Sequence, residues 1–446
     1  MPASVEGHHR SGRTVKNVLM LSYHFYPFNH IATQRVAKMA KFLPKYGWNP
    51  LIVCPRWTRE NCEFFDPNMV SAFEDSNVVG AIEYRCCLSG GLIRRMLSKC
   101  SVTMDPRILA VSALRYFARS LEKYPPELYY GVIRFLRRFL QTHHVDCIWA
   151  TAPGPMAHAV AHWANRTFGI PWVADFRDIY DQKGLPEYER AKSYLRKIEP
   201  RIVSSSSAIV TVSEHLKKIL QARYDSPVCI IPNGFDPSDY QESNAFIRQD
   251  WKVFSIAYTG KIIFPLRDPS PLFEALEVLI SRRQIDSSKI RVCFYGTQAD
   301  GTVEALLSRF PNLNGIVEVR ARIPLAESVK IQKGACILLH LAHGGEKGIM
   351  TGKIFEYLGA RRPILCIPGD HDCVDALLTQ TNAGAICHNT EETAAQLLRW
   401  YKEWQNTGSV SYQGREEEIM KYSRQEQARQ LARLLDESIV DPKEPK

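Results

Sequence analysis

Short apolar runs alternate with helical patterns along most of the chain, and this alternation constrains the fold more than any other feature. In the first half, VLMLS (18–22) and PLIVCP (50–55) flank a segment in which apolar residues recur at helical spacing. Similar runs predict strands near 81–85, 146–150, 172–175, 208–212 and 228–231. Continuous apolar strands separated by helices are typical of a parallel sheet with helices on both faces.

The alternation stops once and then restarts. Residues 232–250 are rich in Pro, Asn, Asp and Ser, and this composition predicts a turn-rich connector. Five more apolar runs follow, at 254–258, 291–295, 317–320, 336–340 and 363–367. The segment 416–438 has the pattern of one long amphipathic helix. We therefore predict an α/β protein with two doubly wound parallel-sheet domains and a closing helix.

The predicted domain boundaries follow these composition changes. A polar, flexible leader covers 1–15, the first domain 16–240, the second 241–415, and the closing helix with its tail 416–446. A chain of 446 residues is long enough for two domains that each have a core. In such open sheets ligands bind outside the carboxyl ends of the strands, so the loops that follow the strands, and a cleft between the two domains, are expected to form the site.

Composition narrows the location and the chemistry. No apolar run reaches transmembrane length, and the first residues lack the apolar core of a signal peptide, which predicts a cytoplasmic protein. The twelve cysteines are scattered without a CxxC pair, so we expect reduced core thiols and no metal site. There is no GxGxxG and no P-loop, which removes the main sequence support for nicotinamide chemistry and for NTP hydrolysis, and no cofactor is expected.

The positive charge is concentrated in one segment. Residues 91–140 contain ten Lys or Arg residues against three acidic ones, in a chain whose formal net charge is +10. Two amphipathic helical patterns lie in this segment, and basic helices of this kind can lie on an anionic membrane surface. The alternative is the solvated face of two packed helices. Nucleic acid is not expected as a partner, because no recognised binding motif accompanies the charge.

The segment 351–365, TGKIFEYLGARRPIL, is the strongest candidate for a binding site. A turn at Thr351 and Gly352 precedes a short predicted helix on which Lys353 and Glu356 share one face. The N-terminus of a helix suits a phosphate, and a carboxylate one turn deeper can accept two hydrogen bonds from a ribose diol. The pattern therefore predicts a site for a nucleotide sugar; the alternative is an ordinary βα unit with a surface Lys–Glu pair.

A second loop supplies another cation. The run FSIAYTGKIIFPLR predicts a strand and a turn at Gly260, followed by Arg267 before the next helix. A guanidinium can bind two phosphate oxygens at once, so Arg267 and Lys353 together could clamp a diphosphate without a metal. Arg267 could instead pair with Asp268 or with a helix C-terminus. Residues 340–350 form a glycine-rich loop that a sugar ring could approach closely.

In the first half, three polar residues follow predicted strands. His158 lies in the first turns of a predicted helix after TAPGP, and Arg177 and Asp178 follow the strand at 172–175. They are candidates for contacts with a polar substrate. The alternatives are a structural histidine and a cluster of internal ion pairs that also includes Asp175.

The order of these motifs resembles a known family. YPF with Arg35, GIPWVADFRD, IVTVSEHL, IIPNGFD, YTG with Arg267, and GKIFEYLGARRPIL together resemble the GT-B glycosyltransferases, specifically glycosyltransferase family 4, over roughly 17–436. The resemblance implies an N-terminal acceptor domain, a C-terminal nucleotide-sugar domain, a final helix that crosses back, no required metal, and retention of anomeric configuration.

The resemblance also implies roles for individual residues. Glu356 matches the second acidic residue of the E-x7-E motif, which binds ribose, and Arg267 and Lys353 resemble the diphosphate contacts. His158 resembles a histidine near the transferred sugar. The first glutamate of the motif is replaced by Gly348, so Glu346 either substitutes for it or the role is lost.

The sequence thus predicts a retaining, metal-independent glycosyltransferase that uses a nucleotide diphosphate sugar. The expected acceptor is a saccharide or lipid-linked saccharide of cell-envelope polysaccharide synthesis, at the inner face of the cytoplasmic membrane if the basic segment binds lipid. Two alternatives stay open: a nucleotide-sugar 2-epimerase of the same fold, and a non-catalytic protein that binds a sugar nucleotide.

Overall fold

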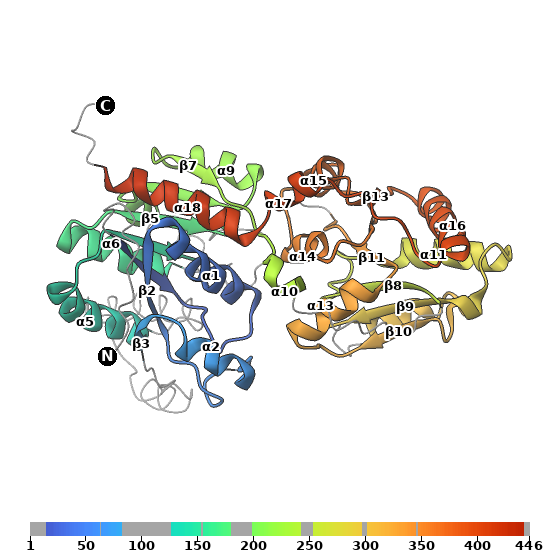
Figure 1. Ribbon diagram of the computed structural model, residues 1–446, viewed down its shortest axis with the longest axis horizontal. Coiled ribbons are helices and arrows are strands. Elements are labelled where there is room, and N and C mark those ends of the chain that lie inside the picture. Colours follow the sequence, from blue (N-terminus) through green and yellow to red (C-terminus); the bar gives the residue numbers. More distant parts are fainter. Residues whose placement is uncertain are drawn as a thin grey trace, which may run out of the picture. The chain divides into compact units, whose positions relative to one another are not determined.

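The computed structural model contains two compact units (Figure 1). It describes residues 15–62, 64–82, 126–152, 155–179, 199–241, 253–296, 301–344 and 347–440. Unit 1 comprises Met1–Thr211, Leu216–Ile231 and Ala428–Lys446; unit 2 comprises Val212–His215 and Pro232–Gln427. The expected leader at 1–15 and most of the basic segment at 91–140 lie outside the described residues.

Unit 1 is built on a seven-stranded parallel sheet in the order β3-β2-β1-β4-β5-β6-β7. Its strands are β1 (Lys16–Ser22), β2 (Trp48–Pro55), β3 (Val78–Ile82), β4 (Cys147–Thr151), β5 (Trp172–Phe176), β6 (Ala208–Thr211) and β7 (Val228–Ile230). Its helices are α1 (Ile31–Phe42), α2 (Val70–Glu74), α5 (Pro126–Thr142), α6 (Met156–Phe168), α9 (Glu214–Gln221) and most of α18 (Arg424–Ile439). The predicted strands of this half are confirmed, although β3 begins three residues earlier than expected.

Unit 2 contains a six-stranded parallel sheet in the order β10-β9-β8-β11-β12-β13. Its strands are β8 (Phe254–Thr259), β9 (Ile290–Tyr295), β10 (Val317–Arg320), β11 (Ile337–His340), β12 (Ile364–Cys366) and β13 (Gly384–Ile386). Its helices are α10 (Pro237–Gln241), α11 (Ser270–Ser281), α12 (Thr302–Leu307), α13 (Leu325–Gly334), α14 (Gly352–Ala360), α15 (Cys373–Thr381), α16 (Thr390–Thr407) and α17 (Glu416–Met420). The doubly wound fold is confirmed in both units; β13 was not predicted.

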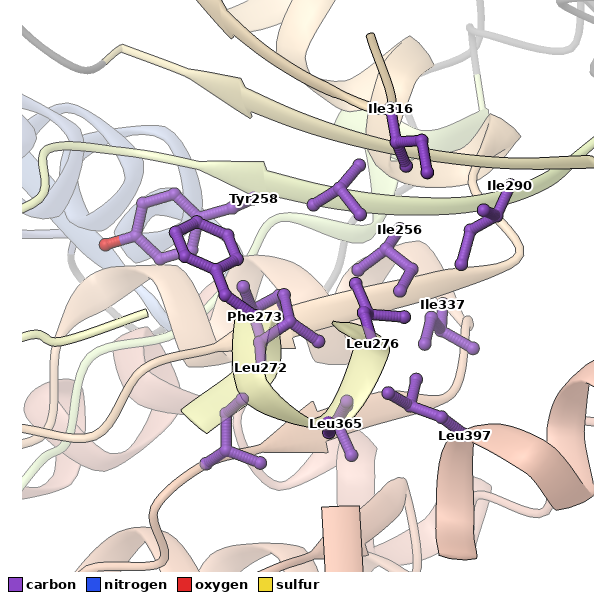
Figure 2. Close-up of a cluster of buried hydrophobic side chains, with 14 of the residues drawn as sticks. Ile256, Tyr258, Leu272, Phe273, Leu276, Ile290, Ile316, Ile337, Leu365 and Leu397 are labelled. Atoms are coloured by element: carbon purple, nitrogen blue, oxygen red, sulfur yellow. The ribbon is translucent and has the colours of Figure 1, made fainter. Parts of the chain in front are cut away.

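Strand β8 shows why the sheet of unit 2 is covered on both faces. Side chains alternate along a strand, so Phe254, Ile256 and Tyr258 enter one core with α11 and α16, while Ala257 enters another with α13, α14 and α15. Figure 2 shows the first of these cores, in which Ile256 and Tyr258 lie against Leu272 and Phe273 of α11. The Tyr258 hydroxyl points away from the labelled aliphatic side chains and donates to the Lys261 carbonyl at 3.0 Å. The end of this strand is therefore rigidly anchored.

The C-terminal segment is two helices where the sequence predicts one over 416–438. α17 ends at Met420, and the chain then forms a bridge between Phe235 and Ser423, with the Arg424 N–H donating to the Phe235 carbonyl at 2.8 Å. α18 begins after this bridge and continues into unit 1. The amphipathic pattern runs through the break because the break depends on a contact with a distant part of the chain.

Helix α18 closes one face of the sheet in unit 1, which also carries α1 (Figure 1). Ala428, Leu431 and Leu435 are fully buried in the core that contains Val18 and Trp149. At the end of the helix, a carboxylate oxygen of Asp436 accepts a hydrogen bond from the Trp48 indole at 3.0 Å and forms an ion pair with Lys16. The C-terminal helix is thus an integral part of the N-terminal core.

Replacing Leu431 with alanine is expected to destabilise unit 1. The side chain is fully buried, so its truncation removes apolar contacts and leaves a cavity, at a cost of about 2–5 kcal/mol. Urea unfolding followed by tryptophan fluorescence should show an earlier transition for Leu431→Ala. The control Arg433→Ala changes an exposed position on the same helix and should unfold like the wild type. Equal midpoints for both variants would show that α18 is not part of this core.

Candidate functional site

The candidate site of unit 2 lies where three neighbouring parallel strands end. β11 pairs with β8 on one side and with β12 on the other, so the segments after Thr259, His340 and Cys366 leave the same edge of the sheet. The loop after β11 leads directly into α14. The Gly344 N–H donates to the Leu266 carbonyl at 2.7 Å, which joins the loop after β8 to the glycine-rich loop after β11. This edge is where an open α/β sheet binds ligands.

Lys353, in the first turn of α14, lies against the end of β8. Its Nζ is 3.4 Å from the centroid of the Tyr258 ring, close enough for a cation–π interaction. Gly260 has φ of +144°, and a Cβ there would lie 2.5 Å from Lys353 Cε and 2.6 Å from Nζ. A glycine is therefore required at 260 both by the backbone conformation and by the space that the lysine occupies. Burial, and then the Arg267 charge, lower the pKa of Lys353 well below its usual value.

Arg267 is the second cation of the site. Its Nη1 donates to the Lys261 carbonyl at 3.2 Å, and its Nε is buried without a hydrogen-bond partner. Asp268 instead accepts from the Ser270 N–H at 2.8 Å at the start of α11, so the expected alternative of an Arg267–Asp268 pair is not seen. Within the described ranges, neither Arg267 nor Lys353 forms an ion pair with a carboxylate. Two adjacent cations without a carboxylate partner favour binding of an anion.

Glu356 lies one turn after Lys353 on the same helix. One of its carboxylate oxygens accepts from Gln332 Nε2 at 3.4 Å, and Gln332 also donates to the Thr259 hydroxyl at 2.9 Å. The backbone carbonyl of Glu356 accepts from the Tyr240 hydroxyl at 2.8 Å. Burial raises the pKa of Glu356, while Gln332 and Lys353 oppose that rise. The carboxylate is positioned by neighbours and does not form a Lys353–Glu356 ion pair.

The start of α14 is open at its N-terminus. Thr351 is the N-cap residue, yet its side chain makes no capping hydrogen bond, and its buried hydroxyl has no partner in the described part of the chain. Gly352 follows as the first helical residue. Uncapped N–H groups and the positive end of the helix dipole favour an anion at this position.

His340 is a member of this constellation that the sequence did not reveal. It ends β11, its side chain is buried, and its Nδ1 has no hydrogen-bond partner within the described ranges. Burial, together with the positive charges of Lys353 and Arg267, lowers the pKa of His340 to about 3, so the imidazole is neutral at physiological pH. The available signal was a polar residue at the carboxyl end of an otherwise apolar strand, CILLH.

The predicted residues of unit 1 have different surroundings. His158 is fully buried, its Nε2 is 3.0 Å from the Ala150 carbonyl oxygen, and burial lowers its pKa to about 4. Its ring packs against Phe176, with 4.7 Å between ring centroids. Arg177 donates to the Ala152 carbonyl at 2.7 Å, and Asp178 is exposed. The contacts of His158 are those of a structural histidine. A role for His158 toward a substrate stays a prediction.

Asp175 has a partner that the sequence did not suggest. Its carboxylate pairs with Arg35 at 2.8 Å, with both side chains almost completely buried, and accepts from the Thr151 hydroxyl at 2.6 Å. The expected cluster of Asp175, Arg177 and Asp178 is therefore not what holds Asp175, whose ion pair with Arg35 connects β5 to α1. Glu346, the expected substitute for the missing glutamate, lies outside the described residues.

Comparisons with known proteins identify similar chains. A family model described as Glycosyltransferase Family 4 matches residues 32–239. HepE from Anabaena, solved in complex with UDP and glucose, is 15% identical over 95% of this chain and 100% of that chain, with a TM-score of 0.59. A glycosyltransferase from Rickettsia africae is 12% identical over 96% of this chain and 99% of that chain, with a TM-score of 0.60. Sucrose-phosphate synthase from Thermosynechococcus elongatus is 10% identical over 95% of this chain and 98% of that chain, with a TM-score of 0.57. No curated protein matches the sequence. At these identities, the solved structures show the two-sheet fold alone.

Because the pKa of Lys353 is lowered, binding of an anion should be coupled to proton uptake when the pH is near that lowered pKa. In a fraction of the unliganded molecules the Lys353 amine is then neutral, because its pKa is lowered. A bound dianion favours the charged ammonium and so restores the proton. Affinity for a nucleoside diphosphate should therefore fall as pH rises through the lowered pKa. Calorimetry in two buffers of different ionisation enthalpy measures the proton uptake.

The matched variants for this measurement are Lys353→Met and Lys289→Met, the second at an exposed position of unit 2. Lys353→Met should abolish the proton uptake, and Lys289→Met should leave it unchanged. Identical binding heats in the two buffers for the wild type would contradict the assignment of Lys353 as the titrating cation.

Proposed function

We propose that this chain, which matches the model of Glycosyltransferase Family 4 over residues 32–239, transfers a sugar, with retention of configuration and without a metal, from a nucleotide diphosphate sugar to a saccharide or lipid-linked saccharide. In this proposal residues 241–415 bind the donor, residues 16–240 bind the acceptor, and 416–446 close the chain. Hydrolysis of the donor is the competing reaction that such an enzyme must suppress.

One observation carries the donor side of the proposal: two cations and a carboxylate lie together at the carboxyl ends of the strands in unit 2. Lys353 and Arg267 would bind the diphosphate, with the N–H groups at Gly352 contributing, and Glu356 would accept from the ribose hydroxyls. Gly260 leaves room for the lysine. Thr351 offers an unpaired hydroxyl at the same helix end.

The same cations supply the catalytic effect. As the bond between the anomeric carbon and the diphosphate oxygen breaks, negative charge grows on the departing nucleotide diphosphate. Lys353 and Arg267 are placed before the reaction starts, so they stabilise that charge without reorganisation. The acceptor hydroxyl forms the new bond to the anomeric carbon, and its proton passes to the departing phosphate. His158, Arg177, Asp178 and Glu346 are proposed to contact the sugar or the acceptor.

The location of the acceptor is proposed from the exposed positive charge of α5. α5 is confirmed as an amphipathic helix, but Val132 and Leu136 on its apolar face are buried within unit 1. What remains exposed is an arginine face with Arg134, Arg137 and Arg138. No helix in the described ranges has the length and apolarity needed to cross a bilayer. We therefore propose peripheral, electrostatic contact with an anionic membrane that carries the acceptor, as in polysaccharide synthesis at the inner face of the cytoplasmic membrane.

A donor screen tests the reaction class. UDP-glucose is the first candidate, because HepE was solved in complex with UDP and glucose. Release of nucleoside diphosphate that requires a membrane lipid extract supports a transferase. Conversion of the sugar nucleotide without acceptor would favour the epimerase, and binding without turnover across donors and acceptors would favour the non-catalytic alternative.

Arg267→Ala is expected to lower kcat/KM for the donor by about 10²–10³-fold, the usual cost of removing one donor that stabilises charge in a transition state. The fold should persist, because the Arg267 side chain donates to the Lys261 carbonyl of its own loop and forms no ion pair within the described ranges. Arg282→Ala, an exposed arginine in the same unit, is the matched control and should retain activity. Equal kcat/KM for the two variants would remove Arg267 from the mechanism.

Removing the arginine face of α5 should weaken membrane binding. Each cation near an anionic surface contributes about 1 kcal/mol, so the triple variant Arg134→Ala/Arg137→Ala/Arg138→Ala should bind anionic vesicles about 100-fold more weakly at low salt. Sedimentation with vesicles containing phosphatidylglycerol measures this. The control changes three exposed cations of unit 2, Arg282, Lys289 and Arg309, to alanine. Equal sedimentation of both triple variants would overturn the assignment to α5.

A further inference from the structure

Two imidazoles and a carboxylate converge at the carboxyl ends of the last two strands of unit 2. His371 follows β12, Asp375 lies in the first turn of α15, and His388 follows β13. One ligand atom from each of the three residues lies within 4.8 Å of the others. The proposed glycosyl transfer uses none of them.

We propose that His371, Asp375 and His388 form a binding site for a divalent transition metal, with zinc as the expected ion. Two imidazole nitrogens and one carboxylate oxygen are a donor set that zinc and its neighbours in the transition series accept, with water completing the coordination. Calcium and magnesium are not expected, because they prefer sites made of oxygen ligands. This proposal is independent of the proposed function.

Backbone hydrogen bonds orient the carboxylate of this group. The Asp375 carboxylate accepts backbone N–H groups on both oxygens, from Asp370 at 3.1 Å and from His371 at 3.0 Å. Each oxygen keeps a further lone pair for a metal. The backbone N–H of His388 donates to Glu392 at 2.9 Å, which places a second negative charge beside the histidines. Hydrogen bonds that orient a ligating carboxylate are a regular feature of metal sites.

The His388 ring is seated against a backbone without a side chain. A Cβ at Gly369 would lie 2.3 Å from His388 Cε1 and 2.6 Å from its Nδ1, so any other residue at this position would displace the ring. The loop after β12 therefore accommodates the imidazole from the loop after β13 at close range. This contact brings two histidines that are 17 positions apart in the sequence onto one face.

Metal binding requires one small rearrangement. The two imidazoles are stacked, with centroids 4.0 Å apart and planes 9° from parallel, whereas a metal lies in the plane of each ring that binds it. One ring must therefore rotate. His388 Nε2 and the Asp375 carboxylate are 3.9 Å apart, compared with about 3.4 Å between two ligands of a tetrahedral zinc. The His388 side chain is 34% exposed, so rotation and a contraction of this size meet little steric resistance.

A neighbouring group of Asp370, Asp372 and Cys373 is the rival site. Its Asp370 carboxylate already accepts the N–H groups of Asp372 at 2.9 Å, of Val374 at 3.0 Å and of Asp375 at 3.0 Å, and so satisfies N–H groups at the start of α15. Asp372 accepts the Gly348 N–H. Because these carboxylates already accept hydrogen bonds from the backbone of the loop, the histidine group is the better candidate for a metal site. A sulfur ligand would distinguish the two groups.

The experiment is a calorimetric titration of zinc chloride into the full-length, reduced protein. We expect the wild type to bind one zinc ion. The double variant His371→Ala/His388→Ala should bind zinc at least 100-fold more weakly. The matched control is His143→Ala/His144→Ala, which removes two exposed histidines of unit 1, one of them 3.0 Å from Asp146. This control should bind zinc like the wild type. Circular dichroism melting checks that each variant is folded, and His388→Asn serves as a milder variant if the double variant is not.

Zinc X-ray absorption of the loaded wild type provides the second readout. Nitrogen and oxygen ligands, without sulfur, are expected. Equal zinc affinity in the wild type and the His371/His388 variants, no zinc binding by the wild type, or a sulfur ligand from one of the twelve cysteines would each overturn the proposal. Loss of binding in the His143/His144 control as well would also overturn it, because the site would then not be local to unit 2.

Discussion

Two positive charges placed side by side without a carboxylate partner are the constraint on which the rest of unit 2 depends. Lys353 lies over the Tyr258 ring and beside the bare backbone of Gly260, and Arg267 is close enough to lower the pKa of that lysine. Charges that are removed from water and brought together cost free energy. A bound diphosphate would offset that cost, and this is the physical reason to regard the arrangement as a binding site.

The parallel sheet makes the arrangement possible. β8 is packed on both faces, so the turn at Gly260 and the ring of Tyr258 are held in place by cores on either side. β11 lies between β8 and β12, and its last residue, His340, is a buried, neutral imidazole close enough to both cations for their charges to lower its pKa. A charged histidine would add a third cation. Rigid strand ends and a neutral imidazole together fix the two charged side chains before a ligand arrives.

The elements of the fold could be predicted from the sequence because a buried parallel strand is a continuous apolar run. β13 was not predicted because Gly384–Ile386 is three residues long and half-buried, so it does not form a continuous apolar run. The break before α18 escaped because it depends on a bridge to Phe235, almost 190 positions earlier. Helical periodicity reports which face is buried, and both helices of the tail bury the same stripe.

In the candidate site, too, only the residues that are neighbours in the sequence could be predicted to lie together. Lys353 and Glu356 are neighbours on one helix, so their shared face follows from spacing alone. The Arg35–Asp175 ion pair joins residues 140 positions apart, and the orphaned Nδ1 of His340 depends on what packs around it. Neither has a signature within a short stretch of sequence. Residues that act through tertiary contacts are the ones that only the structure revealed.

A crystal structure with bound UDP would show whether Lys353 and Arg267 contact the diphosphate. Diphosphate oxygens are expected within about 3 Å of Lys353 Nζ and of the Arg267 guanidinium, with the ribose hydroxyls on Glu356. A diphosphate bound elsewhere, with both cations still without an anionic partner, would contradict this expectation.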